Sequence, residues 1–195
     1  MKQLRPAIVI TVLFIIVTGL IYPGIVTGLA QLIFPYQANG SLHYTNGKLV
    51  GSDLIGQYWT SARYFHGRPS ATLTPSGTPS PYEADNSSAS NLGPTSATLL
   101  KSVKDRVTQL KKENPNAPAG PIPVDLVTSS GSGLDPDISV EAALYQVPRI
   151  ANERGMSQDQ VHQLVMNNVQ GKFLGIFGEP LVNVLNLNLA LDNAK

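Results

Sequence analysis

An uninterrupted apolar stretch near the start of the chain limits its fold more than any other feature. Residues 7–34 read AIVITVLFIIVTGLIYPGIVTGLAQLIF, which is 28 residues without a charged side chain. As a helix rising about 1.5 Å per residue, they would extend about 42 Å, more than the roughly 30 Å hydrocarbon core of a bilayer. We therefore predict a transmembrane helix over residues 7–34, with residues 1–6 before it and one domain, residues 35–195, after it.

A cleaved signal peptide is the alternative interpretation of the same stretch. Lys2 and Arg5 form a basic start, Pro23 interrupts the apolar run, and residues 28–30 resemble a small-x-small cleavage site. The run continues past residue 30, however, and the aromatic residues near its end suit a membrane interface. These features favour an anchor that is retained, with membrane lipid around it.

The basic residues near the span predict its orientation. Lys2 and Arg5 precede the apolar stretch, whereas the next basic residue after it is Lys48. Because positive charge is concentrated on the cytoplasmic side of membrane proteins, the N-terminus is expected in the cytoplasm. Residues 35–195 would then form an extracytoplasmic domain attached to the cell membrane by a single pass.

Composition excludes several classes of function. The chain has 14 lysines and arginines against 13 aspartates and glutamates, so it lacks the basic surface that nucleic-acid binding requires. It has no cysteine, which excludes disulfides, thiolate catalysis and cysteine-ligated metals. We expect no nucleic-acid partner.

The first half of the outer domain carries three local signals. Asn46-Gly47 lies between two short β-prone runs and predicts a hairpin. Residues 70–98 are rich in Ser, Thr and Pro, so we expect a long loop there. Residues 95–114 show helical periodicity. The apolar face of this helix is predicted to consist of Leu99, Leu100, Val103, Val107 and Leu110.

The second half mixes strand and helix signals without a regular β-α repeat. Residues 124–130 read as a short buried strand, and residues 139–155 as a helix that Pro148 should kink or divide. Ser157 and Gln160 form a capping box before a further short helix. Leucine alternates with asparagine over residues 181–191, which predicts a half-buried strand. The expected fold class is therefore α+β.

Residues 127–139, VTSSGSGLDPDIS, raise three possibilities: a catalytic loop, a phosphate loop and a metal site. The Gly-Ser-Gly at 131–133 is not a G-x-S-x-G elbow, and no lysine follows at the spacing that a phosphate loop needs. Asp135 and Asp137 alone are too few oxygen ligands for calcium. We interpret the segment as a connection from a strand to a helix that Ser139 caps, and predict neither catalytic nor metal-binding residues.

Two features suit contact with a partner protein. Tyr64, Phe65, His66 and Arg68 form an aromatic and basic cluster typical of a docking surface, although a core strand with one arginine reaching solvent fits equally well. Within the span, Gly24 and Gly28 have the G-x-x-x-G spacing that allows another helix to approach closely.

Nine segments in order along nearly the whole chain resemble the C subunit of the bacterial Kdp potassium-transporting ATPase. The segments are LRPA, TGLIYP, FPYQANGSL, GSDLIGQYW, YFHGRPSA, SNLGP, VDLVTSSGSGLD, YQVPRIANERG and VNVLNLNLALD. The resemblance implies a non-catalytic, single-pass subunit of the bacterial inner membrane. Its implied partners are a channel-like potassium-binding subunit, a P-type ATP-hydrolysing subunit and a small helical subunit.

The resemblance also implies a role in ATP use. Potassium would be transported by the complex, no covalently bound cofactor is implied, and the subunit would act as a catalytic chaperone that raises the ATP affinity of the pump subunit. The matching residue for a nucleotide contact is Gln146 in YQVPR. The predicted topology places Gln146 outside the membrane, away from cytoplasmic ATP, so a helix residue satisfied by its neighbours is the favoured interpretation.

The residues also allow a function of a different class. The chain could be an extracytoplasmic hydrolase or binding module on a membrane anchor, with Ser132 or His66 as the reactive group.

Overall fold

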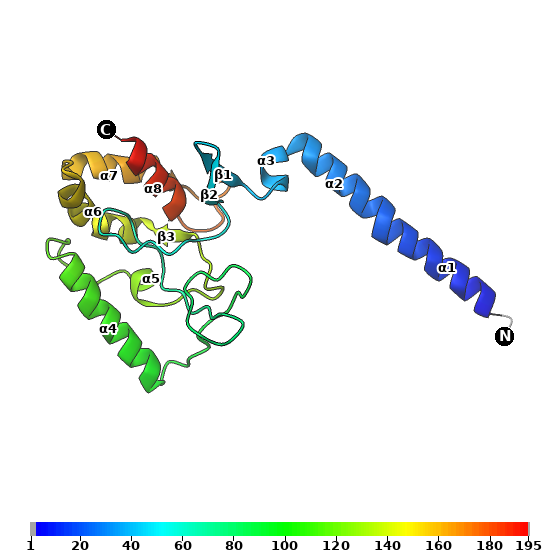
Figure 1. The fold of residues 1–195 in the computed structure, drawn as a ribbon, viewed down its shortest axis with the longest axis horizontal. Helices are drawn as coiled ribbons and strands as arrows, with labels where there is room; N and C mark the ends of the chain where they lie inside the picture. The colour runs from blue at the N-terminus through cyan, green and yellow to red at the C-terminus, as the bar shows by residue number, and fades with distance from the viewer. Residues whose placement is uncertain (1–2, 195) are drawn as a thin grey trace. The chain divides into compact units, whose positions relative to one another are not determined.

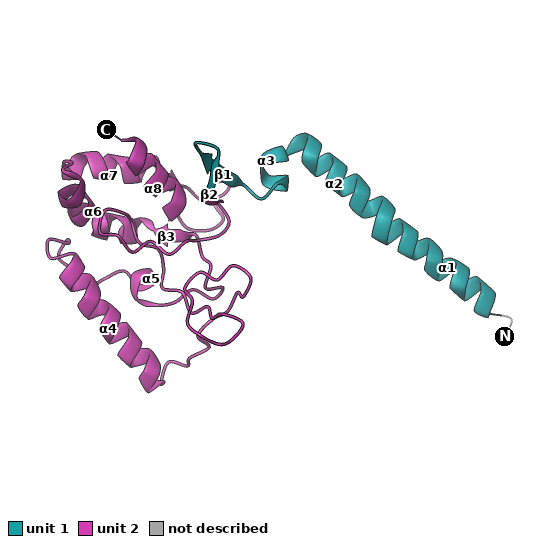
Figure 2. Ribbon diagram, viewed as in Figure 1, with its two compact units in different colours: residues 1–50 teal, residues 51–195 magenta. Residues whose placement is uncertain are grey.

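The computed structural model describes residues 3–194 and divides the chain into two compact units, Met1–Val50 and Gly51–Lys195 (Figure 2). The second unit combines helices with a small antiparallel sheet, so the α+β class predicted from the sequence is confirmed.

The first unit begins with one long helix (Figure 1). It is made of α1 (Leu4–Ile16), a π-helical turn η1 (Val17–Ile21) and α2 (Tyr22–Ile33), and its 30 residues are long and apolar enough to cross a membrane. Pro23 lies in the first turn of α2, directly after the π turn, and does not break the helix. Proline crowds the carbonyl four residues earlier, here that of Gly19. Gly19 lies in the π turn, which is wider than an α-helical turn and so accommodates the proline ring.

A short helix and a hairpin follow the long helix. The helix is α3 (Pro35–Ala38), and strands β1 (Leu42–Thr45) and β2 (Lys48–Ser52) pair with each other. Asn46 and Gly47 between them have φ values of 52° and 75°, as a type I′ turn requires. The hairpin predicted at Asn46-Gly47 is confirmed.

The second unit holds a three-stranded antiparallel sheet of order β3-β5-β4 and five helices. The strands are β3 (Asp137–Ser139), β4 (Val169–Gln170) and β5 (Leu181–Asn183), and the helices are α4 (Ala97–Glu113), α5 (Val124–Val127), α6 (Val140–Arg154), α7 (Gln158–Asn167) and α8 (Val184–Asn193). Helix α6 packs against α7 and against both β3 and β5, and α7 also contacts α8.

Helix α6 supplies the largest share of the core. Ser139 caps it by accepting a hydrogen bond from the Ala142 amide, and Glu141 lies in its first turn, as the sequence predicts. Pro148 lies inside the helix without dividing it. Proline has no N–H, so the carbonyl four residues earlier loses its helical hydrogen bond. The helix tolerates this loss because the turns around Pro148 are buried in the core, and tertiary contacts rather than helix propensity stabilise them.

Helices α4 and α7 also begin where the sequence predicts. Ser96 caps α4, and Ser157 with Gln160 forms a complete capping box on α7. One residue of the predicted α4 face is wrong, because Leu100 is 61% exposed. The buried side of α4 instead includes the partly buried Arg106, whose guanidinium donates to the Val127 carbonyl at 3.1 Å.

The strand predicted over residues 124–130 is wrong, because residues 124–127 form the single turn of α5. Pro123 enters it with a φ of −54°, and the amide and hydroxyl of Thr128 both donate to the Val124 carbonyl at 2.9 and 2.8 Å. These bonds close the turn locally and leave Leu126 and Val127 buried.

The strand predicted over residues 181–191 is also wrong beyond its first three residues. Asn183 ends β5 and caps α8 by accepting from the Asn186 amide at 3.1 Å. The buried positions Val184, Leu187, Asn188 and Leu191 follow the spacing i, i+3, i+4, i+7 of one helix face. The leucine-asparagine alternation concealed this face because one of its members, Asn188, is polar.

Residues 53–96 form no helix and no regular strand, yet hydrogen bonds order them. Ser70 and Thr72 bind the amides of Tyr82 and Glu83 through their hydroxyl groups, both at 3.0 Å. The Ser88 amide donates to the Ser132 carbonyl at 3.0 Å, which ties the excursion to the connection before β3.

We predict that Asn188→Ala destabilises the protein by about 3 kcal/mol, because it leaves the buried N–H and C=O of Phe65 without partners. Guanidinium unfolding of the full chain in detergent measures this through the fluorescence of Trp59, the only tryptophan. Asn167→Ala, at an exposed position of α7, is the control and should change stability by less than about 0.5 kcal/mol. Equal effects of the two substitutions would contradict the prediction.

Candidate functional site

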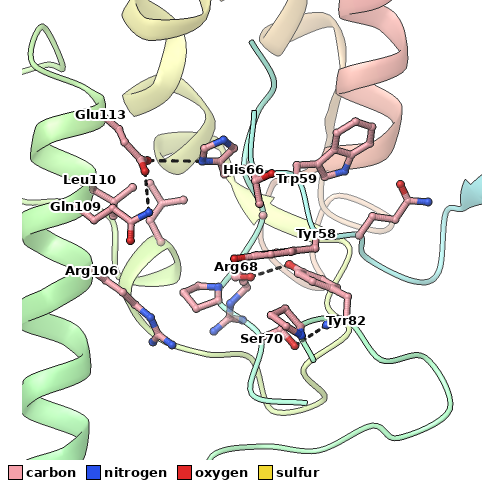
Figure 3. Close-up of a pocket in the computed structure, with 16 residues that line it drawn as sticks. Tyr58, Trp59, His66, Arg68, Ser70, Tyr82, Arg106, Gln109, Leu110 and Glu113 are labelled. Carbon is pink, nitrogen blue, oxygen red and sulfur yellow. Dashed lines mark hydrogen bonds and ion pairs between the residues drawn. The ribbon is translucent and has the colours of Figure 1, made fainter. Parts of the chain in front are cut away.

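The candidate site is a pocket of about 320 Å³ in the second unit (Figure 3). Its wall is built by residues 57–60, residues 66–70, Pro81 and Tyr82, one side of α4, and Leu126. The segment 66–70 therefore decides the shape of the pocket, and its position depends on the side chains behind it.

Two amide side chains hold the start of this segment in place. Asn188 accepts from the Phe65 amide at 2.8 Å and donates to the Phe65 carbonyl at 3.0 Å. Gln146 does the same for His66, accepting from its amide at 2.8 Å and donating to its carbonyl at 3.1 Å. Each side-chain amide thus replaces the partner residue that a neighbouring strand would supply. We call the two side chains, Asn188 and Gln146, with their four hydrogen bonds to Phe65 and His66, the amide clamp.

The hydrogen-bonding capacity of Gln146 is fully used. Besides His66, its Oε1 accepts from Arg149 at 2.7 Å and its Nε2 donates to the Ala142 carbonyl at 3.2 Å. A glutamine amide has two donor hydrogens and one acceptor oxygen with two lone pairs. Gln146 is also fully buried. It therefore has neither the exposure nor a free polar atom for contact with a ligand.

Arg149 is a buried cation that supports the same segment. Its guanidinium donates to the carbonyls of Ala62 and Tyr64 and to Asn114 Oδ1, the last two at 3.0 Å. Burial lowers the pKa of Arg149 to about 10, while the charges of Glu113 and Glu153 act in the opposite direction. The side chain remains protonated at neutral pH and fixes Ala62 and Tyr64 through their carbonyl oxygens.

Arg68 and Tyr82 form one wall of the pocket. Arg68 pairs with Asp135 at 2.9 Å. The Tyr82 hydroxyl donates to the Arg68 carbonyl at 2.7 Å (Figure 3). Burial, with a smaller contribution from the charge of Asp135, raises the pKa of Tyr82. The phenol therefore stays protonated and keeps donating to this carbonyl.

The pocket residues include two buried N–H groups without a hydrogen-bond partner among residues 3–194. They are Nε1 of Trp59 and Nε of Arg68. A buried donor that lacks an acceptor destabilises the folded state. Both nitrogen atoms are closed off from solvent, so this cost lies within the wall of the pocket.

His66 lies between the amide clamp and α4. Its Nδ1 is 3.8 Å from a Glu113 carboxylate oxygen, and its Nε2 is 3.1 Å from the Ser61 carbonyl. Burial, followed by the charge of Arg149, lowers the pKa of His66, and the contacts with Ser61 and Glu113 offset only part of this shift. The imidazole is neutral at neutral pH.

Known proteins match the chain along its whole length. The family model described as "K+-transporting ATPase, c chain" (KdpC) matches residues 4–193. A protein of Bradyrhizobium diazoefficiens named "Potassium-transporting ATPase KdpC subunit" is 56% identical over 200 residues, covering 100% of this chain and 98% of that protein. The chain belongs to the KdpC family. KdpC subunits of Methylobacterium nodulans and Rhodopseudomonas palustris strain BisB18 are 57% and 54% identical, over 98% and 100% of this chain and 97% and 100% of their own lengths.

The four predicted docking residues of this KdpC-family chain do not share one surface. His66 and Arg68 line the pocket, whereas Phe65 is fully buried and belongs to the core. The Tyr64 ring contacts the Trp59 ring at a tilt of 45°, with ring centroids 4.8 Å apart, and the Arg154 guanidinium lies 4.7 Å from the centre of the Tyr64 ring. Phe65 therefore takes no part in a docking surface in this structure, and residues 64–69 reach the core without forming a strand.

The other sequence candidates do not converge on the pocket. Asp135 is paired with Arg68, and Asp137 accepts from Asn183 at 3.1 Å. Across residues 3–194, no group of three acidic or histidine side chains is placed to hold a metal ion. Ser132 Oγ accepts from the Leu134 amide, and the ring of His66 contacts other groups, so these contacts do not form a nucleophile and base pair.

Residue-by-residue sequence analysis missed Tyr82 in the pocket wall, and Asn188 and Arg149 behind it. Asn188 and Arg149 contact segments far along the chain, and no local sequence pattern predicts such contacts. The helical spacing of the buried positions in α8 was the one available signal for Asn188.

We predict that His66 makes the stability of the protein fall as the pH falls from about 7 to about 5. Its pKa is lower in the folded chain than the unfolded value of about 6.5, so the unfolded state binds the proton first. This contribution is complete above the unfolded pKa and is lost as the pH falls through the folded pKa. His66→Gln should show a smaller loss of stability between these pH values, measured by guanidinium unfolding at each.

The control for this prediction is His162→Gln, at an exposed position of α7, which should keep the pH dependence of the unsubstituted protein. If His66→Gln and His162→Gln gave the same pH dependence, His66 would not be its source.

Proposed function

We propose that this chain is a non-catalytic accessory subunit of an ATP-driven, high-affinity potassium uptake complex. The observation that carries the proposal is the match with KdpC subunits over the whole chain, at 54–57% identity. It stabilises the assembly of the channel-like potassium-binding subunit and the P-type ATP-hydrolysing subunit with the small helical subunit.

The long N-terminal helix supports a role within the membrane. Gly24 and Gly28 lie on α2, and a Cβ atom added at either would meet no other atom of the chain within 4 Å. Two glycines at this spacing form a shallow face that permits close approach of another helix. We propose that this face packs against a membrane helix of a partner subunit, with residues 1–6 in the cytoplasm and residues 35–195 on the outer side.

The pocket supports a role for the outer domain. The pocket lining includes Tyr58, Trp59 and Arg68. Arginine and aromatic side chains are the residues that most often dominate protein interfaces. We propose that the pocket face docks on the outer surface of that subunit, near the entrance for potassium.

The buried Gln146 supports an indirect role in ATP use. The family resemblance implies that this residue contacts nucleotide, but in this chain its four hydrogen bonds hold His66, Ala142 and Arg149. We propose that the subunit influences the ATP affinity of the pump through contacts between subunits, and that Gln146 contributes by fixing the segment that lines the pocket.

We predict that Gly24→Leu with Gly28→Leu lowers the amount of partner subunits retained by the chain about tenfold, because two large side chains would separate the helices. The measurement is the yield of partner subunits, and of potassium-stimulated ATPase activity, per tagged chain purified in mild detergent. Val26→Phe is the control, since it adds an exposed bulky side chain to the same helix about 200° around the axis from each glycine.

Retention equal to that of the unsubstituted chain would contradict the packing of this glycine face. The proposed function itself fails if the unsubstituted chain purifies as a stable monomer and potassium uptake does not change when the chain is deleted.

We predict that the full chain in detergent shows no saturable ATP binding that depends on Gln146, because this amide is buried and its hydrogen bonds are used. Equilibrium binding of labelled ATP to the unsubstituted chain and to Gln146→Ala measures this. Gln109→Ala, at an exposed position on the pocket wall, is the control. Saturable binding that disappears in a folded Gln146→Ala protein, and persists in Gln109→Ala, would contradict the indirect role.

A further inference from the structure

His66 and Glu113 face each other across one end of the pocket without a hydrogen bond. Nδ1 of the imidazole lies 3.8 Å from Oε2 of the carboxylate, which is beyond hydrogen-bond distance. His66 belongs to the segment 66–70, whereas Glu113 is the last residue of α4, and both line the pocket (Figure 3). Their side chains are 17% and 29% exposed, so protons from water reach them. A bond between them would connect two walls of the pocket.

The contact with Ser61 fixes the position of the imidazole proton. At neutral pH the ring carries one N–H, on one of its two nitrogens. Nε2 is 3.1 Å from the Ser61 carbonyl, which can only accept, so the proton lies on Nε2. Nδ1 then presents a lone pair to Glu113. Because a carboxylate also only accepts, two acceptors face each other and the gap between them stays open.

A second proton on the imidazole reverses this relation. Protonated His66 carries an N–H at both nitrogens, so Nδ1 becomes a charged donor and the Glu113 carboxylate is its acceptor. Charge-assisted N–H···O bonds are about 2.7–2.9 Å long, so the two side chains would approach each other by about 1 Å. We call the bonded pair of His66 and Glu113 the proton latch.

The surroundings let the two side chains move while the backbone of His66 stays fixed. The amide clamp holds both the N–H and the C=O of His66. Gln109 Nε2 donates to Glu113 Oε1 at 2.7 Å, which leaves Oε2 for His66 (Figure 3). Arg68 is paired with Asp135 and does not compete for Glu113. Closure therefore requires only small rotations of two side chains.

Charged groups from two helices set the pH range in which the latch closes. Burial, followed by the charge of Arg149 on α6, lowers the pKa of His66. The Ser61 carbonyl and the charge of Glu113 on α4 act in the opposite direction and offset only part of this shift. His66 is therefore neutral near pH 7 and takes up its second proton only in acid, below the ordinary value of about 6.5.

We propose that protonated His66 bonds to Glu113, narrows the pocket, and weakens docking of the pocket face on the channel-like subunit in acid. This inference rests on the proposed function, because it requires that docking. It adds a control of the docking by the pH on the outer side of the membrane. A group of the channel-like subunit that enters the pocket at neutral pH has less room once the latch has closed.

The first test observes the latch in the chain alone. ¹⁵N NMR of the full chain in detergent micelles, with labelled histidine, shows which imidazole nitrogen carries a proton, and His66→Gln identifies the signals of His66. We expect a proton on Nε2 alone near pH 7 and on both nitrogens in acid. A proton on Nδ1 alone near pH 7 would overturn the inference.

Glu113→Gln tests the partner of His66 in the same experiment. Loss of the carboxylate should lower the proton affinity of His66 about tenfold or more, because an opposite charge at this distance favours the protonated ring. Glu141→Gln, at an exposed position of α6, is the matched control and should change the affinity by less than about a factor of two. Equal effects of the two substitutions would show that Glu113 is not the partner and would overturn the inference.

The second test measures docking. The tagged full chain with its partner subunits is washed in mild detergent at about pH 7 and at about pH 5, and the retained channel-like subunit is quantified. We expect about fivefold less at the lower pH for the unsubstituted chain and for Glu141→Gln. His66→Gln and Glu113→Gln lack the ion pair, so each should retain similar amounts at both pH values. Each variant is compared with itself, so a general weakening of docking cancels.

The latch and the proposed function fail under different outcomes. Equal retention at both pH values by the unsubstituted chain, or the same acid loss in His66→Gln, overturns the latch and leaves the proposed function standing. An unsubstituted chain that retains no partner subunit at about pH 7 overturns the proposed function, and with it the control of docking.

Discussion

The structure of the second unit depends on the amide clamp. Phe65 and His66 run through the protein interior without a neighbouring strand, so their backbone groups need partners that a sheet would normally supply. Asn188 from α8 and Gln146 from α6 provide them, and each amide satisfies both the N–H and the C=O of one residue. The clamp thereby joins two helices to a segment that is 80 to 123 residues distant in sequence.

The clamp also explains why fold and function are difficult to separate in this chain. Gln146 lies behind the pocket and shapes it, yet it has no atom free for a ligand. A substitution at this position changes His66, which lines the pocket, and Arg149, which holds the preceding carbonyls. Loss of activity in such a variant is therefore weak evidence that Gln146 contacts a substrate, unless the stability of the variant is measured as well.

The sequence predicts those parts of the fold that depend on neighbouring residues. The turn at Asn46-Gly47 and the caps Ser139 and Ser157 are local hydrogen-bond arrangements, and all three are confirmed. Strands are predicted over residues 124–130 and 181–191, where the structure has α5 and most of α8, because apolar spacing over a few residues does not distinguish a strand from a short buried helix. Local hydrogen bonds from Thr128 to Val124 close α5, and the Asn183 cap starts α8.

The candidate site was predictable only in part, for a related reason. His66 and Arg68 stand in an aromatic and basic segment whose composition suits an interface, and both line the pocket. The composition gave no sign that Phe65 between them is fully buried, because Phe65 is directed into the core by Asn188 from a distant helix. Arg149 was unexpected because an arginine in a core requires carbonyl oxygens at fixed positions, and three-dimensional packing alone creates that arrangement.

The π turn at Val17–Ile21 has a consequence for the way the apolar helix presents itself to its surroundings. A π turn contains one residue more than the corresponding α-helical register, which rotates everything after it by about 100° about the helix axis. Rows of side chains that a regular helix would carry along its full length are therefore offset at this turn. A row of side chains that faces one direction before Val17 is therefore rotated away from it after Ile21. The two halves of the helix can present separate surfaces to different neighbours.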